Sequence, residues 1–592
     1  MSVLGDWRRV RRLGGYLHRD RRRLFLSLCL LVPVALAGAV QPLLVGQVIS
    51  VIRGEASLPV LAALSMPAAL RLLVWLLLGS VLVRFAFQRL QLFNIFSVGQ
   101  RLTARIRQDL FSHSLALSLR FHDGMPVGKL LTRLTSDVDA LAEVFASGAV
   151  GVIGDLVSLI VIATTMLLFD WRLGLFLLAT QLPVTAVVLW FQRRYRKANY
   201  RVREELSQLN ADFQENLQGL EVVQMFRREQ VNGSRFARTG AAYRSAVNGT
   251  IFFDSSISAF LEWVSLGAVA TVVAVGGWMV TRDQMGLGTL TTFILYGQRL
   301  FDPLRQLAER FTQIQGGLTA VERIGELLEQ PLEITEADDA RPLEGSGRGE
   351  VIFENVSFSY RPDEPILRNL SFRIAPGEHV ALVGPTGSGK STVIRLLCRL
   401  YEPQTGRILL DGRDIRTIPI ADLRQQLGVV LQDTFLFSGN VADNLRLNRP
   451  ISDQGLQEVC SELGLDGLLQ RLPQGLQTEL RERGGNLSSG ERQLLAVARV
   501  AIRNPTILVM DEATAFMDPS TEATLQRDLD RLLQRRTAVV IAHRLATVEA
   551  SDRILVLRRG ELIEQGTHQD LRARGGLYAQ LADLQERGLA KL

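Results

Sequence analysis

The sequence predicts an α-helical membrane domain followed by an α/β domain on the same chain. The first observation is that residues 24–52 contain no charged side chain, and about 20 residues of helix are enough to span a bilayer. The second is a series of five further apolar runs before residue 301. The third is a change after Glu350 to short β-branched runs separated by glycine and proline turns, which is typical of strands that alternate with helices.

The composition excludes several classes of protein. The chain has 592 residues, carries a formal net charge of +7, and has only 21% charged residues. Charge this sparse excludes a disordered or collagen-like protein, and a positive mean hydropathy argues against a wholly soluble enzyme. The three cysteines, Cys29, Cys398 and Cys460, are too widely spaced for a disulfide framework. We therefore expect the working half of the protein to face a reducing compartment.

Six apolar segments are expected to cross the membrane as helices. They are residues 24–52, 72–87, 144–169, 173–191, 257–280 and 287–300. The second and sixth are short, and Arg84, Asp155 and Glu262 interrupt the second, third and fifth. Ionisable side chains are costly inside a membrane, which makes these three functional candidates. Asp155 and Glu262 could hold cationic drugs, pair with Arg84, or lie near the membrane interface.

The basic residues predict the orientation of these segments. Eight arginines lie between residues 8 and 23, and six Lys or Arg residues lie between 193 and 203. The connections after residues 169 and 280 are brief by comparison. Since cytoplasmic loops carry the excess of Lys and Arg, we expect the N-terminus, both long loops and the C-terminal half to be cytoplasmic. The arginine-rich start could also be interpreted as a nucleic-acid patch or a transit peptide. A segment that anchors the orientation in the membrane requires fewer assumptions, so no nucleic-acid partner is expected.

These patterns divide the chain into four parts. Residues 1–23 form a cytoplasmic N-terminal segment, 24–330 the transmembrane domain, 331–349 a polar linker, and 350–592 the α/β domain. Within the transmembrane domain, the long loops 93–143 and 192–256 have few prolines. We expect their sequences to continue the spans as helices into the cytoplasm.

The strongest chemical signal is a glycine-rich loop after the apolar run 379–383. Residues 384–391 fit the pattern G-x-x-x-x-G-K-[ST], and a helical pattern follows. Glycines let backbone N–H groups approach phosphate oxygens, and the helix N-terminus favours an anion. Lys390 is expected to reach the β- and γ-phosphates of ATP, and the Ser391 hydroxyl to ligate Mg²⁺. The expected phosphate-binding residues are Gly384, Pro385, Thr386, Gly387, Ser388, Gly389, Lys390, Ser391 and Thr392.

Two further strands are expected to end in polar side chains. The apolar run 506–510 is followed by Asp511 and Glu512. Asp511 suits Mg²⁺ binding, and Glu512 is placed to polarise an attacking water. The run 539–542 is followed by His543, although a single histidine at a strand end is usually structural.

Residues 487–493, Leu-Ser-Ser-Gly-Glu-Arg-Gln, resemble the signature motif of ATP-binding cassette (ABC) proteins. Together with the six spans, the chain resembles an ABC exporter half-transporter of the multidrug and lipid exporter type over nearly its whole length. This resemblance implies the type IV ABC exporter fold. It also implies a dimer that holds two ATP molecules between facing cassettes.

The resemblance assigns roles to single residues. Tyr360 corresponds to the aromatic residue that stacks on adenine, and Gln432 to the Q-loop glutamine that contacts Mg²⁺ and the membrane domain. Asp518 corresponds to the D-loop aspartate, and His543 to the switch histidine that contacts the γ-phosphate. In the signature motif, Ser488 and Gly490 are expected to approach the γ-phosphate bound by the partner.

Other segments resemble the parts that couple the two domains. Residues 121–137 resemble the first intracellular loop, 215–219 fall where the second coupling helix is expected, and 478–484 resemble the X-loop. The departures from the family pattern are Ser489 in place of glycine and Glu491 in place of glutamine in the signature motif. Arg481 stands where glycine is common in the X-loop, and the D-loop reads Ala-Phe-Met-Asp. None of these departures removes a predicted catalytic group.

The resemblance implies an ATP-driven exporter of drugs, lipids or other amphipathic molecules that works by alternating access. A gated channel or channel regulator on the same fold is the alternative, and a missing Glu512 or a large regulatory insert would favour it. The six spans exclude a soluble ABC ATPase, and importers usually carry the two domains on separate chains. The partner is a second copy or a different half-transporter, and a bacterial inner membrane is the expected location.

Overall fold

A computed structural model of the chain describes most of its residues. These are residues 15–16, 18–55, 59–144, 148, 150–343, 347–431, 434–447, 449–511, 531–533, 536–542 and 545–589. The chain divides into two compact units. The first comprises Met1–Leu115 and Val127–Gln330, and the second comprises Ala116–Pro126 and Pro331–Leu592.

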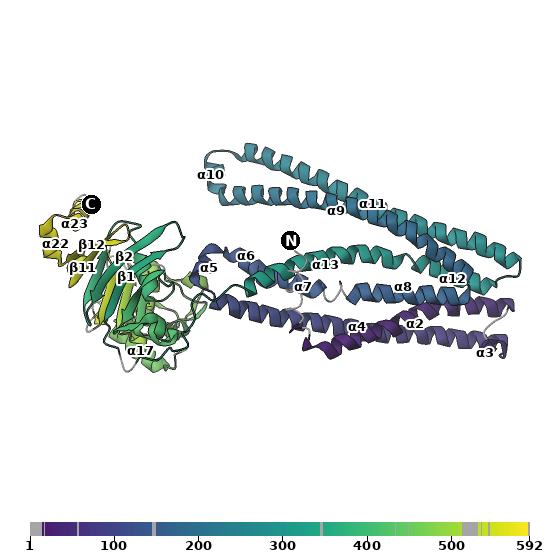
Figure 1. Ribbon diagram of the computed structural model, residues 1–592, viewed down its shortest axis with the longest axis horizontal. Coiled ribbons are helices and arrows are strands. Elements are labelled where there is room, and N and C mark those ends of the chain that lie inside the picture. The colour runs from purple at the N-terminus through teal and green to yellow at the C-terminus, as the bar shows by residue number, and fades with distance from the viewer. Residues whose placement is uncertain are drawn as a thin grey trace. The chain divides into compact units, whose positions relative to one another are not determined.

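The described part of the first unit is helical (Figure 1). Its elements are α2 (Arg21–Arg53), α3 (Pro59–Ala62), α4 (Met66–Ala116), α6 (Val127–Thr132), the π-helical turn η1 (Arg133–Asp137), α7 (Val138–Glu143), α8 (Val150–Phe169), α9 (Trp171–Gln218), α10 (Leu220–Met225), α11 (Glu229–Thr281), α12 (Leu287–Arg299) and α13 (Asp302–Leu328). Five of them, α2, α4, α8, α9 and α11, are long and apolar enough to cross a membrane. These five correspond to the first five predicted spans.

The sixth predicted span differs from the other five. Helix α12 has only 13 residues and ends at Arg299, and α13 begins at Asp302. Pro303 lies in the first turn of α13. A proline has no N–H to donate to the carbonyl four residues earlier, and its ring clashes there, so a helix cannot pass through it undisturbed. Helix α12 therefore agrees with the predicted sixth span, 287–300, to within one residue, and the helical pattern expected from residue 302 onward forms the separate helix α13.

Helices α2 and α12 pack closely because small residues face each other. A Cβ atom on Gly46 would lie 2.0 Å from Thr292 Oγ1 and 2.4 Å from the Gly288 carbonyl oxygen. A Cβ on Gly288 would lie 2.0 Å from Ser50 Oγ. Small residues at such a crossing let two membrane helices approach to backbone contact. The crossing fixes which face of α12 is presented to α2.

Helices α9 and α11 form a long hairpin with α10 at its tip (Figure 1). The hairpin confirms that the second long loop continues the spans as helices, and α4 does the same for the start of the first. At the opposite end, Asp170 caps α9 by accepting hydrogen bonds from the Arg172 and Leu173 N–H groups. The segment 215–219, where the resemblance places a coupling helix, forms the end of α9 instead, and the short helix at the tip is α10.

A buried carboxylate joins the two helices of this hairpin near its tip. Asp212 on α9 is 2% exposed. It accepts hydrogen bonds from Thr239 Oγ1 at 2.7 Å and from Arg235 Nη2 at 3.1 Å, both on α11. These contacts, led by the Thr239 hydroxyl, hold the pKa of Asp212 below its usual range. The ion pair therefore holds the tip of the hairpin together while Asp212 is ionised.

The second unit is built on two main sheets. Its strands are β1 (Val351–Ser359), β2 (Pro365–Ile374), β3 (His379–Val383), β4 (Thr405–Leu410), β5 (Arg413–Asp414), β6 (Leu427–Val430), β7 (Gly439–Asn440), β8 (Glu479–Leu480), β9 (Ile507–Asp511), β10 (Thr537–Ile541), β11 (Arg553–Arg558) and β12 (Glu561–Gly566). One sheet has the order β2-β1-β4-β5, another β12-β11-β3-β10-β9-β6, and β7 pairs with β8. In the six-stranded sheet, β11, β3, β10, β9 and β6 run parallel.

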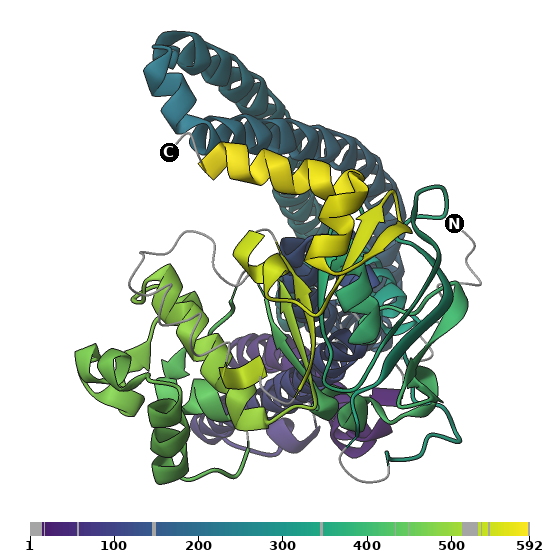
Figure 2. The ribbon, with the colours of Figure 1, turned by 90° about the vertical axis from the view of Figure 1, so that its left-hand side faces the viewer.

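The helices of the second unit cover these sheets. They are α5 (Leu119–Gly124), α14 (Lys390–Leu397), α15 (Ile420–Gln426), α16 (Val441–Arg446), α17 (Asp453–Glu462), α18 (Asp466–Arg471), α19 (Ser489–Arg503), α21 (Leu545–Glu549), α22 (His568–Arg574) and α23 (Leu577–Leu589), with short 3-10 turns at Ile415–Thr417, Gly475–Gln477 and Glu482–Gly484. Figure 2 shows α16–α18, in green, gathered to one side of the strands.

Two hydrophobic cores lie on opposite faces of the six-stranded sheet. Side chains alternate along a strand, so β3 contributes Val380 and Leu382 to one core and Ala381 to the other. The first core fills the space between the two main sheets, and the second packs against the helices α16–α19. This packing fixes the end of β3, where the phosphate loop begins.

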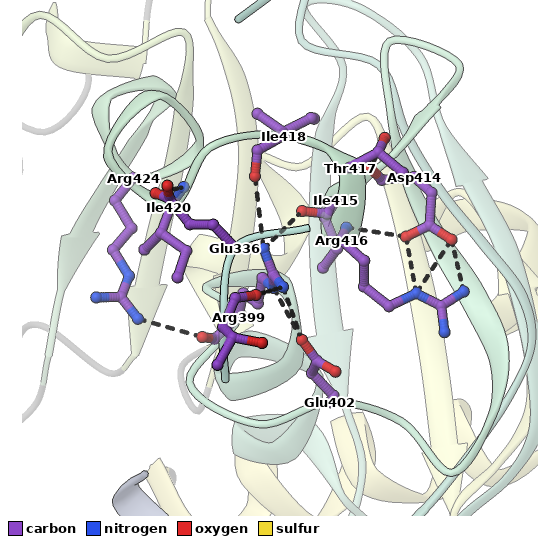
Figure 3. Close-up of polar contacts among 11 residues, drawn as sticks. Glu336, Arg399, Glu402, Asp414, Ile415, Arg416, Thr417, Ile418, Ile420 and Arg424 are labelled. Atoms are coloured by element: carbon purple, nitrogen blue, oxygen red, sulfur yellow. Dashed lines mark hydrogen bonds and ion pairs between the residues drawn. The ribbon is translucent and has the colours of Figure 1, made fainter. Parts of the chain in front are cut away.

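The start of the predicted linker packs onto the second unit through a buried arginine (Figure 3). Arg399 is 2% exposed, and its guanidinium donates to the Thr335 carbonyl at 2.9 Å and to Glu402 Oε1 at 2.9 Å. It also donates to the carbonyl oxygens of Ile415 and Ile418, each at 3.4 Å. Arg424 in turn donates to the Arg399 carbonyl oxygen. Arg399 therefore forms hydrogen bonds with five residues, which belong to different segments of the second unit.

Candidate functional site

The predicted phosphate loop connects the central strand β3 to helix α14. Its glycines adopt positive φ angles, 155° at Gly384, 81° at Gly387 and 101° at Gly389, which favour glycine. A Cβ atom on Gly384 would lie 2.2 Å from the Leu557 carbonyl oxygen, and one on Gly389 would lie 2.6 Å from Leu367 Cδ2. The loop therefore needs glycine for its backbone and for its packing, as the sequence pattern predicts.

The side chains of the loop are arranged around its backbone. Lys390 is 7% exposed, and its Nζ donates to the carbonyl oxygens of Gly384 at 2.7 Å and Pro385 at 3.2 Å. Pro385, Thr386 and Gly387 are exposed, whereas Ser388 is buried. Among the described residues, the Ser388 hydroxyl oxygen is buried without a hydrogen-bond partner. The lysine ammonium thus lies over the loop, close to where its N–H groups would receive phosphate.

Two predicted metal ligands from distant parts of the sequence come together. Ser391 Oγ donates to Asp511 Oδ2 at 3.3 Å, across 120 positions of sequence. Strand β9 carries Asp511 to the same edge of the sheet at which β3 ends, since β10 pairs in parallel with both. Hydroxyl and carboxylate oxygens are the donors that Mg²⁺ prefers, so this pair fits the metal predicted from the sequence.

Tyr360 belongs to an aromatic and polar cluster beside α14. Its hydroxyl is 3.2 Å from Thr392 Oγ1 and accepts from Arg395 Nη1 at 3.3 Å. Its ring lies edge-on to Tyr401, with centroids 5.2 Å apart. The Tyr401 hydroxyl donates to a carboxylate oxygen of Asp123 on α5. Burial, with a further contribution from Asp123, raises the pKa of Tyr401 above its usual range.

This cluster was not found from the sequence. Asp123 lies within the segment that resembles the first intracellular loop, and α5 is the short helix in that segment. No pattern along the chain indicates that Tyr401 is its partner, because 278 positions separate them. Tyr401 therefore links Tyr360, the predicted adenine-binding residue, to Asp123 on α5. Helix α5 belongs to the predicted loop between the second and third spans.

The signature motif begins helix α19. Ser488 is the N-cap residue, its hydroxyl accepts from the Glu491 N–H, and the Glu491 carboxylate accepts from the Ser488 N–H at 2.9 Å. This is a capping box, which glutamate or glutamine at the third helical position can complete. Glu491 therefore retains a contact available to the family's glutamine. Ser488 is exposed and Gly490 is buried.

Gln493 is a second residue whose role the sequence did not reveal. It is 4% exposed, accepts from Thr434 Oγ1 at 2.9 Å, and donates to the Leu431 carbonyl oxygen at 3.2 Å. Leu431 follows β6 and directly precedes the predicted Q-loop glutamine. Gln493 therefore ties the helix of the signature motif to the residues on either side of that glutamine.

Four predicted site residues lie outside the described residues: Gln432, Glu512, Asp518 and His543. The strands that precede three of them are described: β6 ends shortly before Gln432, β9 ends directly before Glu512, and β10 ends shortly before His543. In the X-loop, the Arg481 N–H donates to Asn486 Oδ1 at 3.0 Å, and its side chain is exposed. The positive φ angles in this loop fall at Arg483, at 57°, and at Gly484, at 65°, whereas Arg481 has a φ of −72°.

The ionisable residues of the spans are placed differently from one another. Asp155 on α8 forms an ion pair with Arg310 on α13, with Oδ2 and Nε 3.0 Å apart. Arg84 on α4 donates to Gln41 Oε1 on α2 at 3.4 Å, so the alternative in which Asp155 pairs with Arg84 is not what the structure shows. Glu262 on α11 is exposed, and it forms no ion pair within the described part of the chain.

Comparisons with known proteins agree with both units. A family profile described as "ABC transporter transmembrane region" matches residues 24–304, and one described as "ABC transporter" matches residues 367–515. The solved structure of a bacterial Atm1-family ABC exporter with ATP bound is similar, with a TM-score of 0.76 and 31% identity, and the match covers 95% of this chain and 98% of that chain.

Two curated relatives are similar over most of their length. The chain is 34% identical over 522 residues to the probable multidrug resistance ABC transporter ATP-binding/permease protein YheH of Bacillus subtilis, which covers 87% of this chain and 77% of the relative. It is 32% identical over 524 residues to the ATP-dependent lipid A-core flippase of Nitrosococcus oceani, which covers 88% and 87%. With the phosphate loop, the capped signature helix and the multi-pass membrane helices, these matches show that the chain belongs to the ABC transporter family as an ATP-hydrolysing exporter with membrane and ATP-binding parts fused on one chain.

Proposed function

We propose that the chain exports amphipathic molecules by alternating access, as one half of a dimer that binds two ATP molecules. The observation that carries the proposal is the contact between Ser391 and Asp511 at 3.3 Å. This contact supports a phosphate and metal site in a cassette that is fused to the spanning helices. The similarity to a probable multidrug resistance transporter and to a lipid A-core flippase supports an amphipathic substrate.

In the proposed reaction, water attacks the γ-phosphate of ATP. The loop N–H groups from Gly384 to Ser391 hold the phosphates, and the Lys390 ammonium stabilises negative charge on the transferred group. Ser391 and Asp511 would hold Mg²⁺, which neutralises part of the phosphate charge when it is bound. Glu512 would orient the attacking water and accept its proton, and Gln432 and His543 would complete the site around the γ-phosphate.

The dimer follows from the position of the signature motif. Ser488 and Gly490 are held at the start of α19 by a capping box, and among the described residues neither forms a hydrogen bond with the phosphate loop of its own chain. In a dimer, the signature motif of one chain, together with Asp518, would complete the ATP site of the other. ATP would then favour the closed dimer because it binds that state better than the open one.

Closure of the cassettes would be carried to the membrane by the short helices α5 and α10, which follow the long helices α4 and α9 in the chain. The excess of arginine before the first span supports a cytoplasmic N-terminus and cassette. We place the protein in a bacterial inner membrane. The domain boundaries 1–23, 24–330, 331–349 and 350–592 remain our proposal, and the start of the linker associates with the cassette through Arg399.

The test is the Mg²⁺-dependent ATPase rate of the purified chain in lipid nanodiscs, beside that of Glu512→Gln. We expect robust hydrolysis in dimer-sized particles of the wild type and its loss in the variant. Little activity together with poor dimer formation would show that a different subunit is required. Unchanged hydrolysis in Glu512→Gln would contradict the assignment of this residue.

A further inference from the structure

One polar side chain interrupts the buried face of the signature helix α19. Gln493 is 4% exposed, and it is followed on this helix by the buried apolar residues Leu494, Leu495 and Val497. An amide that is buried without hydrogen-bond partners costs free energy. When both of its ends are bonded, it fixes one arrangement of the segments that it joins, which an apolar side chain of the same size would not do.

The two neighbours of the Gln493 amide fix its orientation. The Leu431 carbonyl oxygen can only accept a hydrogen bond, so the amide nitrogen faces it, with Nε2 and this oxygen 3.2 Å apart. The amide oxygen then faces the Thr434 hydroxyl, which donates to Oε1 at 2.9 Å. Both ends of the amide are therefore bonded, one to the residue before positions 432 and 433 and the other to the residue after them.

A second side chain of α19 holds the residues that come next. Arg499 Nη1 donates to the Phe435 carbonyl oxygen at 3.1 Å, and its Nε donates to the Asn444 carbonyl oxygen at 2.9 Å. The Asn444 side chain accepts from the Phe437 N–H at 2.8 Å and donates to the Phe437 carbonyl oxygen at 2.9 Å. Gln493 and Arg499 therefore attach the segment after β6 to a single helix.

The same helix begins with the signature motif. Five residues separate Ser488, the N-cap, from Gln493, which is about 7–8 Å along the helix axis at 1.5 Å per residue. We infer that Gln493 is a positioning residue for ATP hydrolysis, which holds Gln432 in a fixed relation to the signature motif of its own chain. This inference rests on the proposed function, because that proposal assigns Gln432 to the Mg²⁺ and γ-phosphate site.

The inference separates the rate of hydrolysis from the binding of ATP. Binding would depend on the phosphate loop and Tyr360, which Gln493 does not contact among the described residues. Loss of the Gln493 hydrogen bonds would let Gln432 and α19 move independently. A displacement of about 1 Å in a positioned group can lower a rate by up to about 100-fold. A defect should therefore appear in kcat and not in KM.

The test measures ATPase kinetics of the full-length protein in nanodiscs for variants at both ends of one hydrogen bond. Gln493→Met keeps the length of the side chain, and Thr434→Val keeps its size, but each removes the bond. We expect both to lower kcat roughly 10-fold and to change KM for ATP less than about 2-fold. Thr434→Ser restores the hydroxyl and should keep kcat within about 2-fold of the wild type.

The same pair of residue types supplies a matched control at the other end of the sheet. Thr506 Oγ1 donates to Gln426 Oε1 at 2.5 Å. Gln426 directly precedes β6 and Thr506 directly precedes β9, so this bond lies at the ends of the strands that are opposite to the site. Thr506→Val should lower Tm, as Thr434→Val does, but it should leave kcat within about 2-fold of the wild type.

Hydrogen exchange gives a readout that needs no hydrolysis. A non-hydrolysable ATP analogue with Mg²⁺ should protect the amides of residues 384–391 and 431–437 in the wild type. In Gln493→Met the analogue should still protect residues 384–391, because the phosphate loop is intact. Protection of residues 431–437 should be lost, because these residues are no longer attached to α19 beside Gln432.

Four results would overturn the inference. An unchanged kcat in Gln493→Met would show that the contact does not matter for hydrolysis, and an equal fall of kcat in Thr434→Val and Thr506→Val would show general destabilisation. A raised KM with an unchanged kcat would assign Gln493 to nucleotide binding. Exchange of residues 431–437 that is identical in the wild type and Gln493→Met would show that Gln493 does not hold them.

Failure of the proposed function would be recognised separately. A wild type without ATPase activity would contradict that proposal, whereas the exchange of residues 431–437 would still decide whether Gln493 positions this segment. Loss of their protection in Gln493→Met but not in Thr506→Val would then uphold the positioning role, and equal exchange in the two variants would contradict it.

Discussion

Glu491 shows how a departure from a family pattern can preserve a contact. Its carboxylate accepts from the Ser488 N–H, while Ser488 accepts from the Glu491 N–H, and the two close the first turn of α19. Both side chains lie in the motif that we expect to face the partner's ATP. The substitution of glutamate for glutamine therefore leaves the helix start intact.

Removal of this cap should weaken the cassette in a predictable way. We expect Glu491→Gln to keep stability and ATPase activity, because glutamine completes the same box. Glu491→Ala should cost about 1 kcal/mol, which lowers the cassette Tm by about 2–4 °C, and it should reduce the ATPase rate. Scanning calorimetry and ATPase assays measure these effects, with Glu561→Ala, at an exposed position at the start of β12, as control. Equal loss in the glutamine and alanine variants would contradict the capping role.

Arg399 is the residue whose loss should most disturb the cassette away from the ATP site. Arg399→Gln removes the donors to the carbonyls of Thr335, Ile415 and Ile418. Buried acceptors left without donors cost about 1–3 kcal/mol, so Tm should fall by several degrees. The control Arg407→Gln removes an ion pair with Glu354 in which both side chains are solvent-accessible, which should cost less than about 1 kcal/mol. An equal effect of both variants on Tm would contradict the anchoring role of Arg399.

At the scale of elements, the crossing of α2 and α12 depends on the absence of side chains. Gly46→Ala would place a methyl group 2.0 Å from Thr292 Oγ1, so we expect a cost of about 1–3 kcal/mol from overpacking. Gly79→Ala on α4 is the matched control, because nothing lies within 4 Å of its Cβ position. Alanine should there be neutral or stabilising by up to about 1 kcal/mol. Thermal unfolding in nanodiscs compares the two, and equal Tm values would contradict the close crossing.

The hairpin of α9 and α11 should respond to acid through Asp212. Its folded pKa is lowered chiefly by the Thr239 hydroxyl, so the stabilisation is complete above the usual aspartate pKa of about 3.9. It is lost as the pH falls through the lower folded value. The amide protons of residues 205–240 should therefore be equally protected from hydrogen exchange at pH 7 and pH 5, and they should lose protection below about pH 4. Asp212→Asn, which lacks the titrating carboxylate, is the reference for this measurement.

Thr239→Val tests the cause of this pH dependence. It removes the hydroxyl that contributes most to the shift, so the folded pKa of Asp212 should rise and protection should be lost at a higher pH than in the wild type. Identical pH profiles for the wild type and Thr239→Val would show that this hydrogen bond does not control the hairpin tip.

For the whole molecule, local patterns in the sequence predicted the architecture well, but they did not predict the contacts between distant segments. The charge-free run 24–52 and the loop 384–391 each need only neighbouring residues, and the structure agrees with both. The end of the sixth apolar run at residue 300 likewise predicted the end of α12 at Arg299, and Pro303 in the first turn of α13 explains why the two helices are separate. The contacts of Tyr401 with Asp123 and of Gln493 with Leu431 join distant segments, so no local pattern could reveal them.

The same distinction applies to charges in the membrane. The sequence marked Arg84 and Asp155 as unusual, but it could not pair them correctly because their partners, Gln41 and Arg310, lie on other helices. The Ser391–Asp511 contact was predictable since a known loop and a strand end meet at one edge of a parallel sheet. The roles of Gln432, Glu512, Asp518 and His543 stay predictions from the resemblance, because these residues lie outside the described part of the chain.

The measurement that tests the central claim most directly is ATP-dependent uptake of a fluorescent amphiphile into proteoliposomes with outward-facing cassettes. ATP added outside should drive the amphiphile into the lumen against its gradient in the wild type, and Lys390→Ala should abolish this uptake. Accumulation that is equal in the wild type and Lys390→Ala, or movement that only follows the gradient in the wild type as through a channel, would contradict an ATP-driven exporter.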